Sequence, residues 1–203
     1  MAYESLPKHA SVLKFNGSRL SPGYNRQLWS SFFIDLYTDD HIIAWMDNDV
    51  VFLAPATKAT IFNGSRIRIL GSECSMHFGW VRNWAHATET ALGLPMVADF
   101  MTYFPVYLYR DTFTHCKAYI LKRFNTSNFE EAFGKIYYGD NLISPVSVVI
   151  SYARFFERDR YDWNLKTRSE LKSYNRWLPV GHKITLQDTE DILSQPQTAF
   201  HVP

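Results

Sequence analysis

Residues 41–53 read HIIAWMDNDVVFL and join two short apolar runs through an acidic segment. A short continuous run rich in isoleucine, valine, tryptophan and phenylalanine is typical of a buried strand in an α/β sheet. We therefore expect a strand that ends at the acidic segment. Side chains at positions i and i+2 of an extended segment point to the same side, so Asp47 and Asp49 are expected to converge.

Asp47 and Asp49 are consequently a candidate metal site. Open α/β sheets bind ligands outside the carboxyl ends of their strands. Two carboxylates this close repel each other unless a cation lies between them, and their oxygen ligands favour Mg²⁺ or Mn²⁺. The alternative is that both acids only cap a following turn in water.

The composition indicates a globular chain without a strong electrostatic preference for one partner. The chain has 203 residues, enough for one domain with its own core. Lys and Arg number 21 and Asp and Glu number 20, so we expect no nucleic-acid partner. Aromatic residues make up 16% of the chain, and aromatic faces at a cleft would suit nucleobases and sugar rings.

The sequence predicts neither a membrane span nor a secretion signal. It contains no apolar run of about 18 residues, and its first residues lack the apolar region of a signal peptide. Cys74 and Cys116 lack metal-site spacing, so we expect buried free thiols, which fit a reducing compartment. A soluble protein in the cytoplasm is the resulting expectation.

The rest of the chain is predicted to alternate helices with short strands. Further strands are expected at 12–15, 66–70 and 104–109, and helices from residue 24 and over 80–92, 111–124, 127–137, 143–157 and 185–194. Asp111 is expected to cap one helix, and Pro145 to lie in the first turn of another. The charged, aromatic stretch 157–163 is interpreted as a solvated helix end. This alternation predicts a three-layer α/β domain.

The order of these features resembles a known superfamily. A helix that begins at 23–29, a strand, Asp47-Asn48-Asp49 and then Val-Val-Phe-Leu are similar to the metal-dependent GT-A glycosyltransferases, the nucleotide-diphospho-sugar transferases. Their signature is a DxD motif at a strand end. Segments 100–106 and 156–161 also resemble small members. The resemblance implies one Rossmann-like GT-A domain over 1–203, with a mixed, mainly parallel central sheet flanked by helices.

The resemblance also implies an activity and its donor site. A sugar would pass from a nucleotide-diphosphate sugar, expected to be UDP-linked, to a hydroxyl of a glycan, protein or small molecule. Asp47 and Asp49 would hold Mn²⁺ or Mg²⁺, which bridges the diphosphate and stabilises the leaving group. Arg26 and Gln27, in the first turn of the first helix, are candidates for contacts to the donor.

Other candidate residues lie later in the chain. Superfamily members often supply a late histidine to the metal, and His201 or His182 would take that role. An inverting transferase needs a carboxylate to accept the proton of the acceptor hydroxyl, and Asp140, just before a helix, is the candidate. Its alternative role is a plain helix cap. His77 and Trp80 are candidates on the acceptor side.

The sequence departs from the GT-A pattern before the DxD motif, and two other functions fit the same residues. GT-A domains have a β-α-β unit before the DxD strand, whereas 46 residues precede Asp47 here, so the domain is expected to be short at its N-terminus. A haloacid-dehalogenase-like phosphatase would use Asp47 as nucleophile and Asp49 as acid/base, but Ser144 replaces the second acid of its later G-D-x-x-x-D motif. A non-catalytic carbohydrate- or partner-binding domain is the other alternative.

Overall fold

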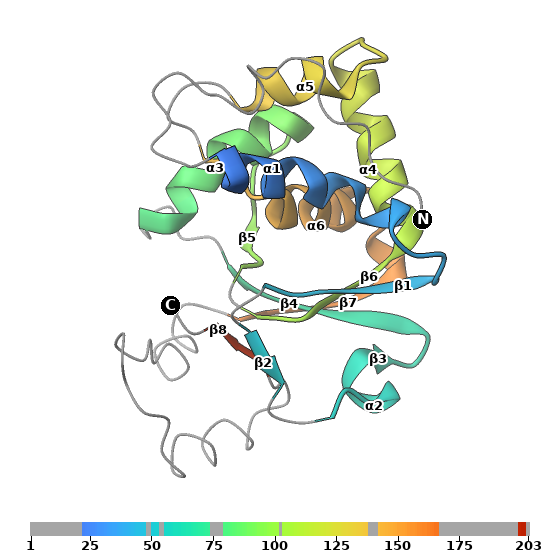
Figure 1. Cartoon of the computed structure of the whole chain (residues 1–203). Coiled ribbons are helices and arrows are strands. Elements are labelled where there is room, and N and C mark those ends of the chain that lie inside the picture. The colour runs from blue at the N-terminus through green and yellow to red at the C-terminus, as the bar shows by residue number, and fades with distance from the viewer. Residues whose placement is uncertain are drawn as a thin grey trace. The chain divides into compact units, whose positions relative to one another are not determined.

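The structure is a computed structural model that describes residues 22–47, 50–52, 55–73, 79–101, 103–137, 142–166 and 199–201. The chain divides into two compact units. Unit 1 comprises Met1–Ile43, Cys74–Val97 and Tyr109–Glu157, and unit 2 comprises Ala44–Glu73, Ala98–Leu108 and Arg158–Pro203. Unit 1 holds the long helices, whereas unit 2 holds most of the described strands (Figure 1).

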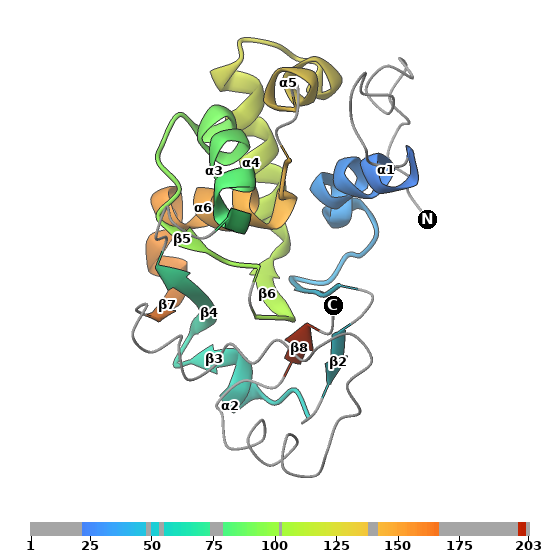
Figure 2. The same cartoon turned by 90° about the vertical axis from the view of Figure 1, so that its left-hand side faces the viewer.

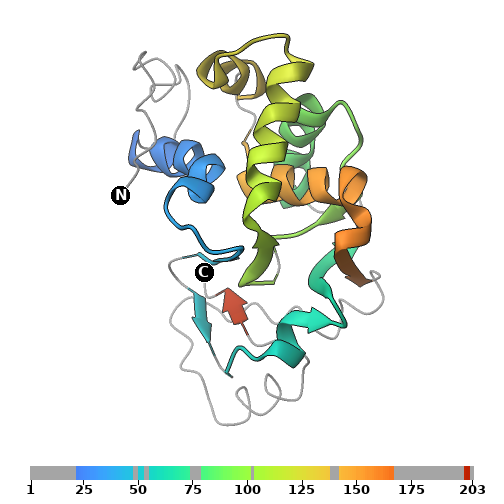
Figure 3. The same cartoon turned by 90° about the vertical axis from the view of Figure 1, so that its right-hand side faces the viewer.

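Unit 1 is built around one buried helix, α6. Its helices are α1 (Pro22–Ser30), the 3₁₀ helix η2 (Ser31–Leu36), α3 (Gly79–Leu92), α4 (Arg110–Arg123), α5 (Phe129–Ile136) and α6 (Pro145–Phe156). Every residue of α6 from Pro145 to Ala153 is buried. Helices α3 and α4 both pack against α6, and Figure 3 shows α6 crossing α4. The apolar composition of α6 therefore reflects burial on all sides.

The ends of these helices follow from local side-chain chemistry. Ser144 caps α6 by accepting a hydrogen bond from the Ser147 N–H at 3.1 Å, and Pro145 follows in the first turn as predicted. Asn128, one residue after the predicted start at residue 127, caps α5. Helix α4 begins at Arg110, with Asp111 in its first turn and no side-chain cap, which corrects the predicted role of Asp111.

Aromatic side chains supply much of the core of unit 1. The rings of Trp29 and Phe133 pack edge to face with centroids 5.4 Å apart, and Phe32 and Phe129 join them at 5.3 Å from each other. Aromatic pairs prefer this tilted geometry because the ring edge is positive and its face negative. In unit 1, the high aromatic content therefore serves packing between α1, η2 and α5.

Unit 2 is centred on the longest described strand, β4. Its elements are β2 (Val50–Phe52), α2 (Lys58–Ile61), β3 (Phe62–Asn63), β4 (Arg66–Glu73), β5 (Ala98–Asp99), the 3₁₀ helix η3 (Arg158–Arg160), β7 (Tyr161–Lys166) and β8 (Ala199–His201). Antiparallel β3 and β5 pair with one edge of β4, and parallel β7 pairs with the other (Figure 2). Gly64, with φ +61°, lies in the β3–β4 turn, and glycine adopts this left-handed conformation without steric cost.

Two further sheets have two strands each. Strands β1 (Ile42–Trp45) and β6 (Val106–Tyr109) form one, and β2 and β8 form the other. The strand predicted at the start of residues 41–53 is thus present as β1. It is only partly buried, because Ile43 is buried whereas Ala44 is exposed.

The predicted GT-A sheet is wrong. Across the described residues the sheets have two, two and four strands, and no large parallel Rossmann-like sheet is formed. Helices and strands do alternate along much of the chain, but alternation does not decide which strands pair. Here β4 takes antiparallel partners on one edge. Antiparallel strands do not need the helical crossover that joins parallel strands. The single-domain assignment over 1–203 stays a prediction.

The stretch predicted to be a solvated helix end is also different. Residues 158–160 form η3, and Tyr161–Lys166 form β7. Tyr161 pairs with Ile67 and Trp163 with Ile69, so both aromatic residues share a face with buried isoleucines. Tyr161 is buried, whereas the charged Arg158 and Asp159 before it remain exposed.

Candidate functional site

Asp47 lies between β1, which ends at Trp45, and β2, which begins at Val50, as the sequence predicts. The Val50 N–H donates to the Asp47 carbonyl at 3.4 Å, so a backbone hydrogen bond joins Asp47 to the start of β2. Asp47 is half-buried, and Asp49 lies outside the described residues.

The C-terminal strand β8 lies beside β2, the strand that follows Asp47. In the antiparallel pairing of β2 with β8, Val50 faces His201, Val51 faces Phe200 and Phe52 faces Ala199. Figure 1 shows the two short strands side by side. The backbone of His201, a candidate metal ligand, is therefore opposite the residue that directly follows Asp49 in the sequence. The structure does not describe the His201 side chain.

The donor types at this place suit a divalent ion. Carboxylate oxygens and an imidazole nitrogen are ligands that Mn²⁺ accepts. Within the described part of the chain, no group of three or more His, Cys, Asp or Glu side chains is arranged to hold a metal. Asp49 and His201 are the candidates for the other donors of a metal site at Asp47. These residue types fit such an ion in kind, and the backbone of His201 lies opposite Val50.

The other predicted site residues lie in unit 1 or outside the described residues. Arg26 and Gln27 lie on α1 in unit 1, whereas Asp47 belongs to unit 2. The Arg26 Nε donates to Ser30 Oγ at 2.9 Å, so this guanidinium is engaged within its own helix. Gln27 is exposed. The structure does not describe Asp140, His77, His182 or the side chain of Trp80.

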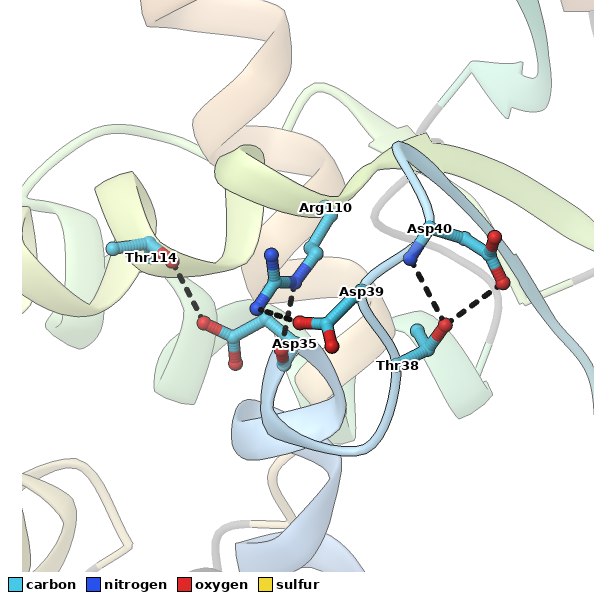
Figure 4. Close-up of polar contacts among 6 residues, drawn as sticks. All are labelled: Asp35, Thr38, Asp39, Asp40, Arg110 and Thr114. Atoms are coloured by element: carbon cyan, nitrogen blue, oxygen red, sulfur yellow. Dashed lines mark hydrogen bonds and ion pairs between the residues drawn. The ribbon is translucent and has the colours of Figure 1, made fainter. Parts of the chain in front are cut away.

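Unit 1 contains a buried ion pair that the sequence reasoning missed. The Asp35 carboxylate of η2 pairs with the Lys117 Nζ of α4, and its other oxygen accepts a hydrogen bond from Thr114 Oγ1 at 2.7 Å (Figure 4 shows the Thr114 contact). Lys117 Nζ also lies 4.9 Å from the centre of the Phe33 ring. Burial lowers the pKa of Lys117, and the contact with Asp35 opposes that shift. These contacts tie η2 to α4.

Arg110 holds the segment that enters β1. Its Nε donates to the Asp35 carbonyl at 2.9 Å, and its Nη2 lies 3.3 Å from Asp39 Oδ1 (Figure 4). Its backbone N–H donates to the His41 carbonyl at 2.9 Å. Within the segment, Thr38 Oγ1 donates to an Asp40 carboxylate oxygen at 2.9 Å. These three contacts indicate that Arg110 positions the segment before β1.

A third polar cluster links α4 to the end of α6. Thr112 Oγ1 donates to Glu157 Oε2 at 2.6 Å, and His115 Nδ1 lies 2.7 Å from Glu157 Oε1. The Glu157 side chain is 7% exposed and that of His115 is 50% exposed. Thr112 is fully buried, so its hydroxyl cannot reach a substrate, and the hydrogen bond to Glu157 ties α4 to the end of α6. Burial raises the pKa of the neighbouring Cys116 thiol, which is consequently unreactive.

Comparison with models of protein families, with curated proteins and with solved structures finds no match to this chain. Among the described helices, none has the length and apolar character that a membrane span requires.

Proposed function

We propose that this chain is a metal-dependent glycosyltransferase that uses a nucleotide-diphosphate sugar, with UDP as the expected nucleotide. One observation carries the proposal. The β2–β8 pairing brings the backbone of His201 opposite Val50, next to the Asp47-Asn48-Asp49 motif. The described residues do not form the large parallel sheet of GT-A enzymes. The site residues, and not the fold, therefore support the proposal.

Each residue has a role that follows from its chemistry. Asp47, Asp49 and His201 would hold Mn²⁺ or Mg²⁺, which supplies positive charge for a departing nucleoside diphosphate. Asp47 is half-buried, so its charge is less screened than that of a fully exposed carboxylate. The hydrogen bond from the Val50 N–H to the Asp47 carbonyl ties its backbone to the start of β2. Asp140 is the proposed base that accepts the proton of the acceptor hydroxyl.

Binding of UDP with and without Mn²⁺ tests the proposal. Isothermal titration calorimetry should show UDP binding that requires Mn²⁺. Asp47→Ala and His201→Ala should each weaken that binding by about tenfold or more, because each removes a metal ligand. The matched controls Asp159→Ala and His86→Ala, at exposed positions, should leave it unchanged. UDP binding that does not depend on Mn²⁺, or on Asp47, would refute the proposed site.

Turnover is measured on the same proteins. UDP release from UDP-glucose, UDP-galactose and UDP-N-acetylglucosamine should require Mn²⁺ and should be lost in Asp47→Ala. Release of inorganic phosphate from a phosphate monoester by the wild-type chain, again lost in Asp47→Ala, would instead identify the phosphatase that the sequence leaves as an alternative.

A further inference from the structure

Unit 2 carries two arginines on one face of its largest sheet. Alternate residues of a strand point to opposite faces, and Ile67 is fully buried, so Arg66 and Arg68 lie on the other face. Directly paired residues share a face, which places Asn63 beside Arg66 and Asp162 beside Arg68. These four residues, Asn63, Arg66, Arg68 and Asp162, define the arginine face.

The carboxylate on the arginine face does not neutralise the arginines. Asp162 Oδ2 accepts hydrogen bonds from Asn63 Nδ2 and from Asn164 Nδ2, each at 3.1 Å. Neutral amides thus occupy this carboxylate oxygen. In the part of the chain that the structure describes, neither Arg66 nor Arg68 takes part in an ion pair. Among the four residues of the arginine face, two positive charges therefore remain beside one negative charge. Asp99 and Lys166, both paired with Ser72, lie farther along the same face of the sheet and balance each other in sign.

Arg68 also has an unsatisfied buried donor. Arg68 is half-buried, and its Nε is inaccessible to water and has no hydrogen-bond partner among the described residues. A buried donor on a charged group is unfavourable unless an acceptor meets it. An anionic oxygen is the acceptor that a guanidinium binds best. Because the Nε is closed to water, an anion would contact Arg68 through the terminal nitrogens of its guanidinium.

We propose that the arginine face binds a phosphate group, independently of any metal at Asp47. Guanidinium groups match phosphate oxygens in geometry and can bind two of them at once. Residues i and i+2 of a strand are roughly 7 Å apart, so Arg66 and Arg68 can contact one phosphate or diphosphate. The net charge of +1 does not provide the extended basic surface that nucleic acid requires. The phosphate belongs to a phosphorylated small molecule or to a lipid headgroup.

Calorimetric titration of pyrophosphate into the full chain, at low salt and in the presence of EDTA, tests this site. The wild-type chain should bind, Arg68→Gln should weaken binding by about tenfold or more, and Arg66→Gln should weaken it by a smaller factor. Arg66 is exposed, so its variant will fold even if Arg68→Gln does not. The control Lys122→Gln removes one exposed charge from α4 in unit 1 and should have no effect.

Two further experiments distinguish a lipid headgroup from a free phosphorylated ligand, and the arginine face from the metal site at Asp47. Sedimentation with phosphatidylcholine vesicles, with and without phosphatidic acid, supports a lipid headgroup if binding needs phosphatidic acid and Arg66. Pyrophosphate binding without vesicle binding supports a free phosphorylated ligand. Asp47→Ala should keep the binding in EDTA, whatever it does to UDP. Failure of the wild-type chain to bind either probe, or binding by both arginine variants equal to that of the wild type, overturns the proposal.

Discussion

Removal of Lys117 tests how strongly the buried ion pair holds η2 to α4. The Asp35 side chain is 6% exposed and that of Lys117 is 13% exposed. Lys117→Met keeps the length and the contact with Phe33 but removes the charge. Asp35 would then retain the hydrogen bond from Thr114 at 2.7 Å and lose its counter-ion. Breaking a buried pair from one side costs about 3–5 kcal/mol, so we expect Lys117→Met to lower the free energy of unfolding by about 3 kcal/mol.

A double-mutant cycle separates the pair from its surroundings. Asp35→Asn alone should destabilise the chain by a similar amount, because it leaves the Lys117 charge without its partner. The double variant should lose less than the sum of the two single losses, by on the order of 2–3 kcal/mol. Urea unfolding followed by circular dichroism gives the free energies of unfolding. Single losses that add to within about 0.5 kcal/mol would refute the coupling.

An exposed pair on α5 serves as the matched control. Lys135 Nζ lies 2.6 Å from Glu131 Oε1, four residues earlier, and their side chains are 47% and 51% exposed. Lys135 lowers the pKa of Glu131, but solvent screens the pair. The same cycle on Glu131 and Lys135 should show a small coupling that disappears at high salt. The coupling between Asp35 and Lys117 should persist there.

Two glycines and one cysteine support further predictions. Gly93 has φ +69° at the end of α3, so Gly93→Ala should lower the free energy of unfolding by about 1–2 kcal/mol. Gly134 lies within α5 with open space where the Cβ of an alanine would lie, so Gly134→Ala should raise it by about 0.5–1 kcal/mol in the same urea assay; equal effects at both positions would contradict the backbone argument. Burial raises the pKa of Cys116 above its ordinary value of 9.0, so above pH 9 the unfolded chain releases a proton that the folded chain keeps. The stability from Cys116 is therefore present below pH 9 and is lost as pH rises, by up to about 1.4 kcal/mol per pH unit. Cys116→Ala should flatten this decline, and an unchanged slope between pH 9 and 10 would show that other groups cause it.

Local patterns predicted the helices well because their signals are local. The start of α6 follows from Ser144 and Pro145, whose side chains act on the adjacent turn. The end of α3 follows from Gly93, whose N–H donates to the Glu89 carbonyl at 2.7 Å. Hydrophobic spacing likewise located β4 and β6 to within a few residues. Each of these predictions depends on residues that are near neighbours in the sequence.

Pairing between distant segments could not be predicted in the same way. The charged stretch that becomes η3 and β7 has no clear strand pattern, and its pairing with β4 depends on Ile67 and Ile69 far earlier in the chain. The buried pair of Asp35 and Lys117 had no signal either, because an acid in one helix and a lysine in another are common on solvated faces.

The same distinction between local signals and long-range pairing applies to the candidate site. The sequence by itself determined that Asp47 and Asp49 stand between two short apolar runs, because that arrangement needs no distant residue. The tertiary structure alone decided that the runs belong to different small sheets, that the Val50 N–H bonds to the Asp47 carbonyl, and that His201 pairs with Val50. Strand pairing depends on backbone hydrogen bonds and packing between distant segments, and every residue type except proline offers the same backbone groups. Composition and spacing therefore cannot select the partner, whereas the folded chain does.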